Sequence, residues 1–160
     1  MAKPNAVQLI SAELTQLRSH CALISETWFT SKHESSVVAK EGYDLYRRDR
    51  CKGRGGGVCA YVRNNVKCST YCPAAMPTAS RPNAIEILWL ECFFACRHYY
   101  IASCYHPPRP KYKDSQFVEL LSSDVEYINS TCCDVIIIVA GDFNQLDTSL
   151  AGARFSSDCY

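Results

Sequence analysis

Apolar and polar positions alternate along the chain with two different periods. Apolar residues recur every three or four positions over residues 6–18 and again over 114–128, which predicts two amphipathic helices. Asp114 stands where the second helix begins and is the predicted N-cap. The polar stretch over 30–42 predicts a loop or a short irregular helix.

Shorter apolar or alternating runs predict strands. A buried strand over 21–25 delivers Glu26 at its carboxyl end. Residues 43–50 alternate in the manner of a half-buried strand, a glycine-rich turn follows over 53–57, and 58–62 returns, so these segments predict a hairpin. Residues 84–92 and 99–105 predict a second antiparallel pair, while the proline-containing segment 72–83 is expected to be a loop.

The last predicted strand, over 134–140, is an unbroken run of apolar residues that leads into Gly141-Asp142-Phe143-Asn144. Such a run is typical of burial on both faces. Hairpins with helices inserted between them indicate the α/β (α+β) class, with helices packed on stacked sheets.

The chain has 160 residues and a formal net charge of +1, so no overall electrostatic field favours binding to nucleic acid. A local basic run, which comprises Arg47, Arg48, Arg50, Lys52 and Arg54, is the candidate for such contacts. The alternative is a solvated strand end and loop.

Eleven cysteines show neither a CxxC pair nor metal-finger spacing, so a zinc site is not expected. We interpret them as reduced thiols and expect no disulfide framework. No apolar run reaches the roughly 18 residues of a membrane span, and no apolar signal core follows the first residues. We therefore expect an intracellular protein with no membrane partner and no small-molecule cofactor.

Glu26 and the pair Asp142 and Asn144 are the candidates for chemistry. A carboxylate at a strand end is either a helix-start acceptor or a ligand for a hard cation such as Mg²⁺. Asp142 could take a proton from a water, and the Asn144 amide could donate to a phosphate oxygen. The alternative is a turn in which both side chains bind their own backbone.

Tyr105 ends its strand just before His106-Pro107-Pro108. A phenol in this place either donates to a phosphate or is packed in the core. The imidazole of His106 is a further candidate for contact with the substrate.

Four features occur in a fixed order: a strand ending in Glu26-Thr27-Trp28, a Gly-Gly-Gly-Val hairpin, a Tyr-x-Pro-Pro strand end and a strand ending in Gly-Asp-Phe-Asn. Over about residues 6–150 the chain thereby resembles the endonuclease domain of non-LTR retrotransposons. That domain is an AP-endonuclease-like branch of the endonuclease/exonuclease/phosphatase superfamily. The resemblance implies a four-layer sandwich of two stacked, mainly antiparallel sheets flanked by helices.

By this resemblance Glu26 would bind Mg²⁺ (or Mn²⁺), Tyr105 would hold the scissile phosphate, Asp142 would act on the attacking water and Asn144 would orient the phosphate. His106 stands where the family commonly has Arg. It is a candidate for substrate binding together with Arg50 and Arg54. The implied reaction is hydrolysis of a DNA phosphodiester, which leaves a 3′-hydroxyl that primes reverse transcription in the nucleus.

The resemblance also predicts a single incomplete domain over 1–160. The family's first strand carries an Asn for which Asn5 is no clear substitute, and its final Ser-Asp-His segment is not matched by Ser157-Asp158-Cys159. We therefore expect little or no activity from this chain. The alternatives are a non-catalytic decayed fragment and a phosphoesterase of the same superfamily that acts on a lipid headgroup.

Overall fold

The computed structural model describes residues 6–50, 53–73, 82 and 84–147. Its helices are α1 (Ala6–Leu17), α2 (Ser35–Val38) and α3 (Asp114–Thr131). One sheet has the strand order β1-β3-β2, with β1 Cys21–Ser25, β2 Tyr43–Arg48 and β3 Val58–Arg63. The other has the order β4-β5-β6-β7, with β4 Lys67–Tyr71, β5 Glu86–Phe94, β6 Arg97–Tyr105 and β7 Val135–Asp142.

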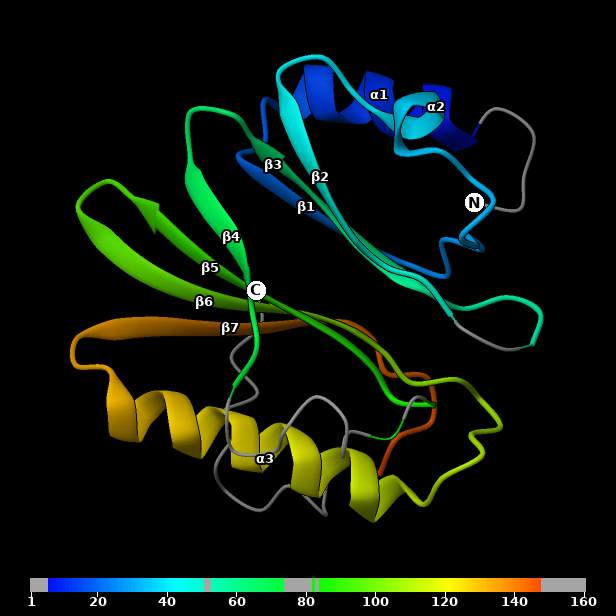
Figure 1. Cartoon of the computed structure of the whole chain (residues 1–160), viewed down its shortest axis with the longest axis vertical. Coiled ribbons are helices and arrows are strands. Elements are labelled where there is room, and N and C mark those ends of the chain that lie inside the picture. Colours follow the sequence, from blue (N-terminus) through cyan, green and yellow to red (C-terminus); the bar gives the residue numbers. More distant parts are fainter. Residues whose placement is uncertain (1–5, 51–52, 74–81, 83, 148–160) are drawn as a thin grey trace.

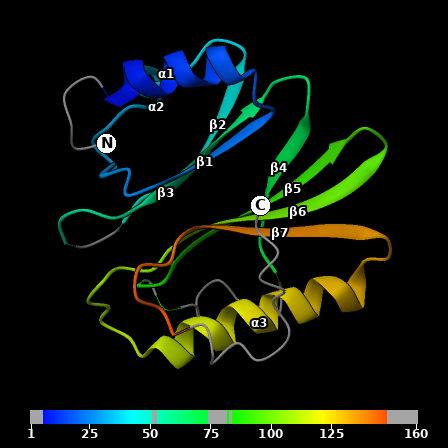
Figure 2. The same cartoon turned by 180° about the vertical axis from the view of Figure 1, so that it is seen from behind.

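These elements form four layers (Figures 1 and 2). Helices α1 and α2 cover the outer face of the first sheet, the two sheets face each other, and α3 covers the outer face of the second sheet. Three hydrophobic clusters fill the three spaces between these layers. The sandwich architecture and the mainly antiparallel pairing expected from the sequence are confirmed; only β6 and β7 pair in parallel among the described strands.

Both long helices form where the period of apolar residues predicts them. In α1 the side chain of Leu14 is buried, but Leu17, predicted on the same apolar stripe, is 69% exposed because the helix ends there. Helix α3 begins one residue earlier than predicted. Lys113 is its N-cap, and Asp114 is the first helical residue. The Lys113 N–H donates to Oε1 of Gln116 at 2.9 Å.

Both predicted antiparallel pairs are confirmed, β2 with β3 and β5 with β6. Strand β4, which pairs with β5, is not predicted because its sequence Lys-Cys-Ser-Thr-Tyr has no apolar alternation. Most of the predicted loop over 72–83 lies outside the described residues, as do Asn5, Lys52 and Ser157-Asp158-Cys159.

The prediction that β7 is buried on both faces is wrong. Among the described strands β7 is an edge strand of its sheet. None of its residues is fully buried, and Ile138 is 41% exposed. Its apolar composition is explained by one face, which packs against the cluster between the second sheet and α3. None of the helices in the described ranges is long and apolar enough to cross a membrane.

Candidate active site

The carboxyl ends of three strands meet at one end of the sandwich. Strands β6 and β7 run in parallel with Tyr105 in register with Asp142. The hydroxyl of Ser25, the last residue of β1, donates to the Cys104 carbonyl at 2.9 Å and accepts from the Asp142 N–H at 3.2 Å. Ser25 thus ties the first sheet to the second where the candidate residues lie. Sequence reasoning did not single out Ser25, because its partners are 79 and 117 positions away.

Glu26 and Tyr105 form a direct contact between the two sheets. The Tyr105 hydroxyl donates a hydrogen bond to Oε1 of Glu26. Glu26 is exposed and has a positive φ of 55°, whereas Tyr105 is 3% exposed. Burial raises the pKa of Tyr105, and the hydrogen bond to Glu26 and the charges of Glu26 and Asp142 raise it further. Tyr105 is therefore a neutral hydrogen-bond donor at physiological pH.

The loop after β7 is held by its own side chains. The Asn144 N–H donates to Oδ1 of Asp142 at 3.0 Å, and the Asn144 amide donates to the His106 carbonyl at 2.8 Å. The His106 N–H in turn donates to the Asp142 carbonyl at 2.8 Å. This is the locally satisfied turn that the sequence left open as an alternative. The turn also holds the exposed side chains of Asp142 and Asn144 next to Tyr105. The same residues can therefore form both the turn and a reacting site.

Gly141 explains why the chain can turn so close to β6. Its φ is +151°, and a Cβ atom there would overlap the backbone carbonyl of Cys104. Only glycine allows this approach of one backbone to another.

Arg50 lies behind Tyr105 and is held by a buried carboxylate. Its Nε is 2.7 Å from Oε1 of Glu86 and its Nη2 donates to Oε2 at 3.1 Å, while Glu86 also accepts from the Gly57 N–H at 3.0 Å. Glu86 is 2% exposed. The hydrogen bonds to Glu86 raise the pKa of Arg50, against the opposing effect of burial. The guanidinium carbon lies 5.7 Å from the centre of the Tyr105 ring, so Arg50 places a fixed positive charge next to the phenol.

Glu86 is a second residue that sequence reasoning missed. It shares its face of the strand with Leu88 and Leu90, which are both buried. The sequence signal for this role was an acidic residue on the same strand face as two buried leucines, because a buried carboxylate requires a charged or hydrogen-bonding partner.

Arg54 lies at the exposed margin of this end of the sandwich. The glycine-rich turn runs alongside the residues that follow β1: the Thr27 N–H donates to the Gly57 carbonyl at 3.1 Å and the Trp28 N–H to the Gly56 carbonyl at 2.8 Å. The Arg54 guanidinium carbon lies 5.5 Å from the centre of the Trp28 ring.

His106 does not present its ring to this site. The side chain is 3% exposed and packs against Tyr112 and Phe117, with ring centres 5.6 and 5.2 Å away. Its Nε2 is 3.3 Å from Oδ1 of Asp114 without hydrogen-bond geometry. Only the backbone of His106 contributes to the loop of Asp142 and Asn144.

The rest of the basic run has mainly structural partners. Arg47 forms an ion pair with Asp49 at 2.6 Å, and Arg48 donates to the Ile85 carbonyl at 3.1 Å.

The side chains at this end of the sandwich provide only some of the ligands that a hard cation needs. The carboxylates of Glu26 and Asp142 offer the oxygen ligands that Mg²⁺ takes alongside its retained waters. Within the described ranges, however, no group of three or more His, Cys, Asp and Glu side chains is placed to hold a metal ion. One or two protein carboxylates are the usual number for Mg²⁺, and the sequence resemblance assigns Glu26 to it.

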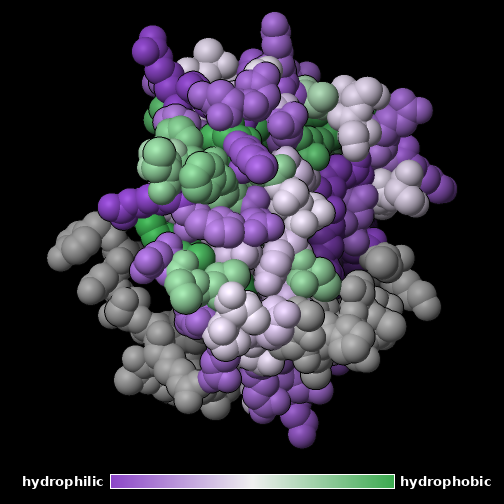
Figure 3. All heavy atoms as spheres, turned by 60° about the vertical axis from the view of Figure 1, so that its left-hand side comes forward, coloured by the Kyte–Doolittle hydropathy of each residue, from purple (hydrophilic) through white to green (hydrophobic). Residues whose placement is uncertain are grey.

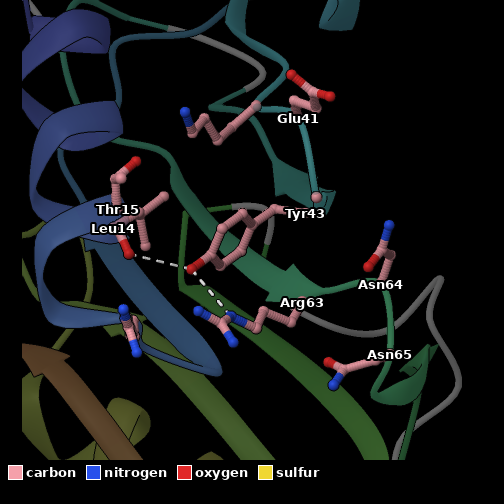
Figure 4. A pocket seen from close by; sticks show the side chains of 10 residues that line it. Leu14, Thr15, Glu41, Tyr43, Arg63, Asn64 and Asn65 are labelled. Carbon is pink, nitrogen blue, oxygen red and sulfur yellow. Dashed lines mark hydrogen bonds between the residues drawn. The ribbon is translucent and has the colours of Figure 1, made fainter.

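A cavity of about 520 Å³ lies at the opposite end of the first sheet (Figure 4). There the Tyr43 hydroxyl donates to the carbonyls of Leu14 and Ser19 at the end of α1 and accepts from Nε of Arg63. Tyr43 pairs with Arg63 in the sheet, whereas Ser25 pairs with Val58 at the other end. The cavity is therefore separate from the candidate active site.

No protein-family model matches the sequence, and a search of curated proteins finds no match. Solved structures do match. D. rerio TDP2 complexed with a single-strand DNA product has a TM-score of 0.61 at 15% identity, over 94% of this chain and 59% of that one. The endonuclease domain of TRAS1, a telomere-specific non-LTR retrotransposon, has a TM-score of 0.57 at 14% identity, over 88% of this chain and 55% of that one.

The human Nocturnin catalytic domain with a bound sulfate anion is also similar, with a TM-score of 0.57 at 18% identity over 86% of this chain and 56% of that one. All three belong to the endonuclease/exonuclease/phosphatase superfamily, and the chain has their fold. The chain spans less than two thirds of the length of each.

Proposed function

We propose, from the endonuclease/exonuclease/phosphatase fold of this chain, that Glu26, Tyr105, Asp142 and Asn144 form the reacting site of a DNA phosphodiesterase. The observation that carries the proposal is the meeting of the two sheets at this end. Tyr105 donates to Glu26 across the sandwich and lies in register with Asp142. A phosphodiester at this end would contact a neutral donor, with one carboxylate beside it for a metal ion and one for the attacking water.

The roles follow from the chemistry of each group. Tyr105 donates a hydrogen bond to a non-bridging oxygen of the phosphate in place of its bond to Glu26, because its raised pKa keeps the hydroxyl protonated. Asp142 accepts the proton of the attacking water, and Asn144, fixed by its bond to the His106 carbonyl, orients the phosphate. Glu26 would hold Mg²⁺, or Mn²⁺ in its place, and the ion would supply positive charge against the developing negative charge of the transition state.

DNA is the substrate class that we propose. Two of the similar structures bear names that support it, a TDP2 with a single-strand DNA product and a retrotransposon endonuclease. In this chain the exposed Arg54 over the Trp28 ring offers a cation and an aromatic face beside the site, a combination that suits a nucleic-acid strand. An origin in a non-LTR retrotransposon and action in the nucleus are part of the proposal.

A plasmid assay tests this function. The 160-residue chain is incubated in equimolar amount with supercoiled DNA, because we expect a low rate, and open-circle product is followed for hours with Mg²⁺ or with EDTA. We expect metal-dependent nicking that falls at least about tenfold in Glu26→Gln, since one charged contact is worth ~1.5–3 kcal/mol. Glu119→Gln, on an exposed position of α3, is the matched control and should retain full activity.

The other outcomes separate the alternatives. Nicking that persists in EDTA, or that is equal in Glu26→Gln and wild type, contradicts the assignment of the site. Salt-dependent DNA binding without any nicking identifies a non-catalytic fragment. Turnover of a phosphoinositide or sphingomyelin headgroup in place of DNA identifies the lipid phosphoesterase.

A further inference from the structure

Two thiols face each other across the first two strands of the second sheet. Cys68 of β4 and Cys92 of β5 are in register, and their sulfur atoms lie 2.9 Å apart. A disulfide bond measures about 2.05 Å, so an approach of less than about 1 Å would suffice to form one. Directly opposed residues in antiparallel strands have Cβ atoms about 4.5–5.5 Å apart, so the two strands would move together slightly to reach the roughly 3.5–4.5 Å of a disulfide.

The surroundings hold the pair in place and leave it reachable. Both cysteines belong to the cluster between the two sheets, with Cys21 and Tyr46 beside them. The Tyr46 hydroxyl donates to the Cys68 carbonyl at 2.8 Å. Cys68 is partly exposed, so a small solute can approach it, and a cavity of about 290 Å³ at this part of β4 and β5 is lined by residues that include Cys68 and Cys92.

The two sulfurs are not equivalent. The Cys92 thiol donates its hydrogen bond to the Cys68 sulfur, which lowers the pKa of Cys68 and raises the pKa of Cys92. Cys21 differs from Cys68, because burial raises its pKa to about 11. Since the thiolate is the nucleophile, Cys68 is the thiol of this cluster that reacts first.

We propose that Cys68 and Cys92 form a site of reversible oxidative modification, at which a hydroperoxide produces a cross-strand disulfide. The Cys68 thiolate attacks the terminal oxygen of the hydroperoxide, the O–O bond breaks, and Cys68 becomes a sulfenic acid while hydroxide or alkoxide leaves and takes up a proton. The Cys92 sulfur then attacks the Cys68 sulfur, the S–O bond breaks, and water leaves with the thiol proton. Two thiols lose two electrons in total, and one peroxide gains them.

The modification would act on stability and not on the reacting site. Cys92 lies six residues along β5 from Glu86, about 20 Å at the rise of a strand, and near the β5–β6 turn. That turn lies on the side of the molecule that faces the viewer in Figure 3. The disulfide closes a loop from residue 68 to 92, which should raise the melting temperature by about 10 °C. The proposal therefore stands or falls independently of the proposed function.

Peptide mapping tests it on the wild-type chain. The reduced protein is treated with a small excess of hydrogen peroxide, the remaining thiols are alkylated, and peptides are analysed with and without dithiothreitol. We expect the peptides of Cys68 and Cys92 to be joined, with a mass lower by two hydrogens, while Cys96 and Cys133, which are exposed, are still largely alkylated. Dithiothreitol should separate the two peptides and reverse the rise in melting temperature.

Serine variants supply the controls. Cys68→Ser and Cys92→Ser should each abolish both the linked peptide and the shift in melting temperature, whereas Cys21→Ser should preserve both. The proposal is overturned if Cys68 and Cys92 remain alkylated when exposed thiols are oxidised, or if Cys21 is the partner found in the linked peptide. It is also overturned if the linked protein melts at the temperature of the reduced form.

Discussion

The ion pair of Arg50 and Glu86 gives a prediction that depends on which partner is removed. The carboxylate is 2% exposed and the guanidinium 22% exposed at its side chain. In Arg50→Met, Glu86 keeps its bond from the Gly57 N–H but loses both contacts to the cation. In Glu86→Gln, the amide oxygen still accepts from Gly57, and the partly exposed Arg50 can reach water.

These differences set the expected magnitudes. Breaking a buried pair so that one charge stays buried costs about 3–5 kcal/mol, which we expect for Arg50→Met. Glu86→Gln replaces charged hydrogen bonds by weaker ones and should cost about 1–2 kcal/mol. The double variant should be more stable than the sum of the two losses predicts, by about 2 kcal/mol, because each substitution removes the same interaction.

Urea denaturation followed by tryptophan fluorescence measures all three free energies of unfolding. Arg109→Met, at an exposed loop position, is the control and should stay within about 0.5 kcal/mol of wild type. A larger loss in Glu86→Gln than in Arg50→Met would refute the reasoning, as would additivity of the two losses within about 0.5 kcal/mol.

Three further variants probe the same end of the sandwich and the core. Ser25→Ala removes the hydroxyl between Cys104 and Asp142 and should lower the free energy of unfolding by about 1–2 kcal/mol; an unchanged urea midpoint would contradict this. Gly141→Ala forces a Cβ into the Cys104 carbonyl and should cost about 3 kcal/mol, so a variant as stable as wild type would exclude the close approach. Burial raises the pKa of Cys59 to about 12, so the unfolded chain loses this proton first and stability should fall as pH rises above about 9, by up to ~1.4 kcal/mol per pH unit for this thiol. Urea titrations between pH 8 and 10 should show a shallower fall in Cys59→Ala, and equal slopes would count against the buried thiol.

Sequence periodicity predicted the elements in which apolar residues recur at a regular local spacing. The two long helices and the two hairpins were predicted because every third or fourth, or every second, residue is apolar. Strand β4 was missed because an edge strand with Lys67, Ser69 and Thr70 has no such pattern. The burial of β7 was overestimated, since an apolar run does not reveal whether both of its faces are covered.

The sequence predicted only those residues of the candidate site that lie at the ends of strands. Glu26, Tyr105 and Asp142 were found from their positions after apolar runs, and the structure brings all three to one end of the sandwich. Ser25 and Glu86 were missed because their roles depend on pairing between distant strands. The ring of His106 was expected beside the substrate, but its neighbours Tyr112 and Phe117 enclose it, and that packing comes from a helix and loop that the sequence does not place.

The most direct test of the proposed site compares two aspartates at opposite ends of β7. Asp142 lies in register with Tyr105, whereas the exposed Asp134 immediately precedes the strand at its other end. Asp142→Asn and Asp134→Asn make the same change in charge and volume, and both are assayed for Mg²⁺-dependent nicking of supercoiled plasmid. We expect Asp142→Asn to lose at least about 100-fold in rate, as for removal of a general base, and Asp134→Asn to match wild type. Equal rates in the two variants would contradict the proposed site.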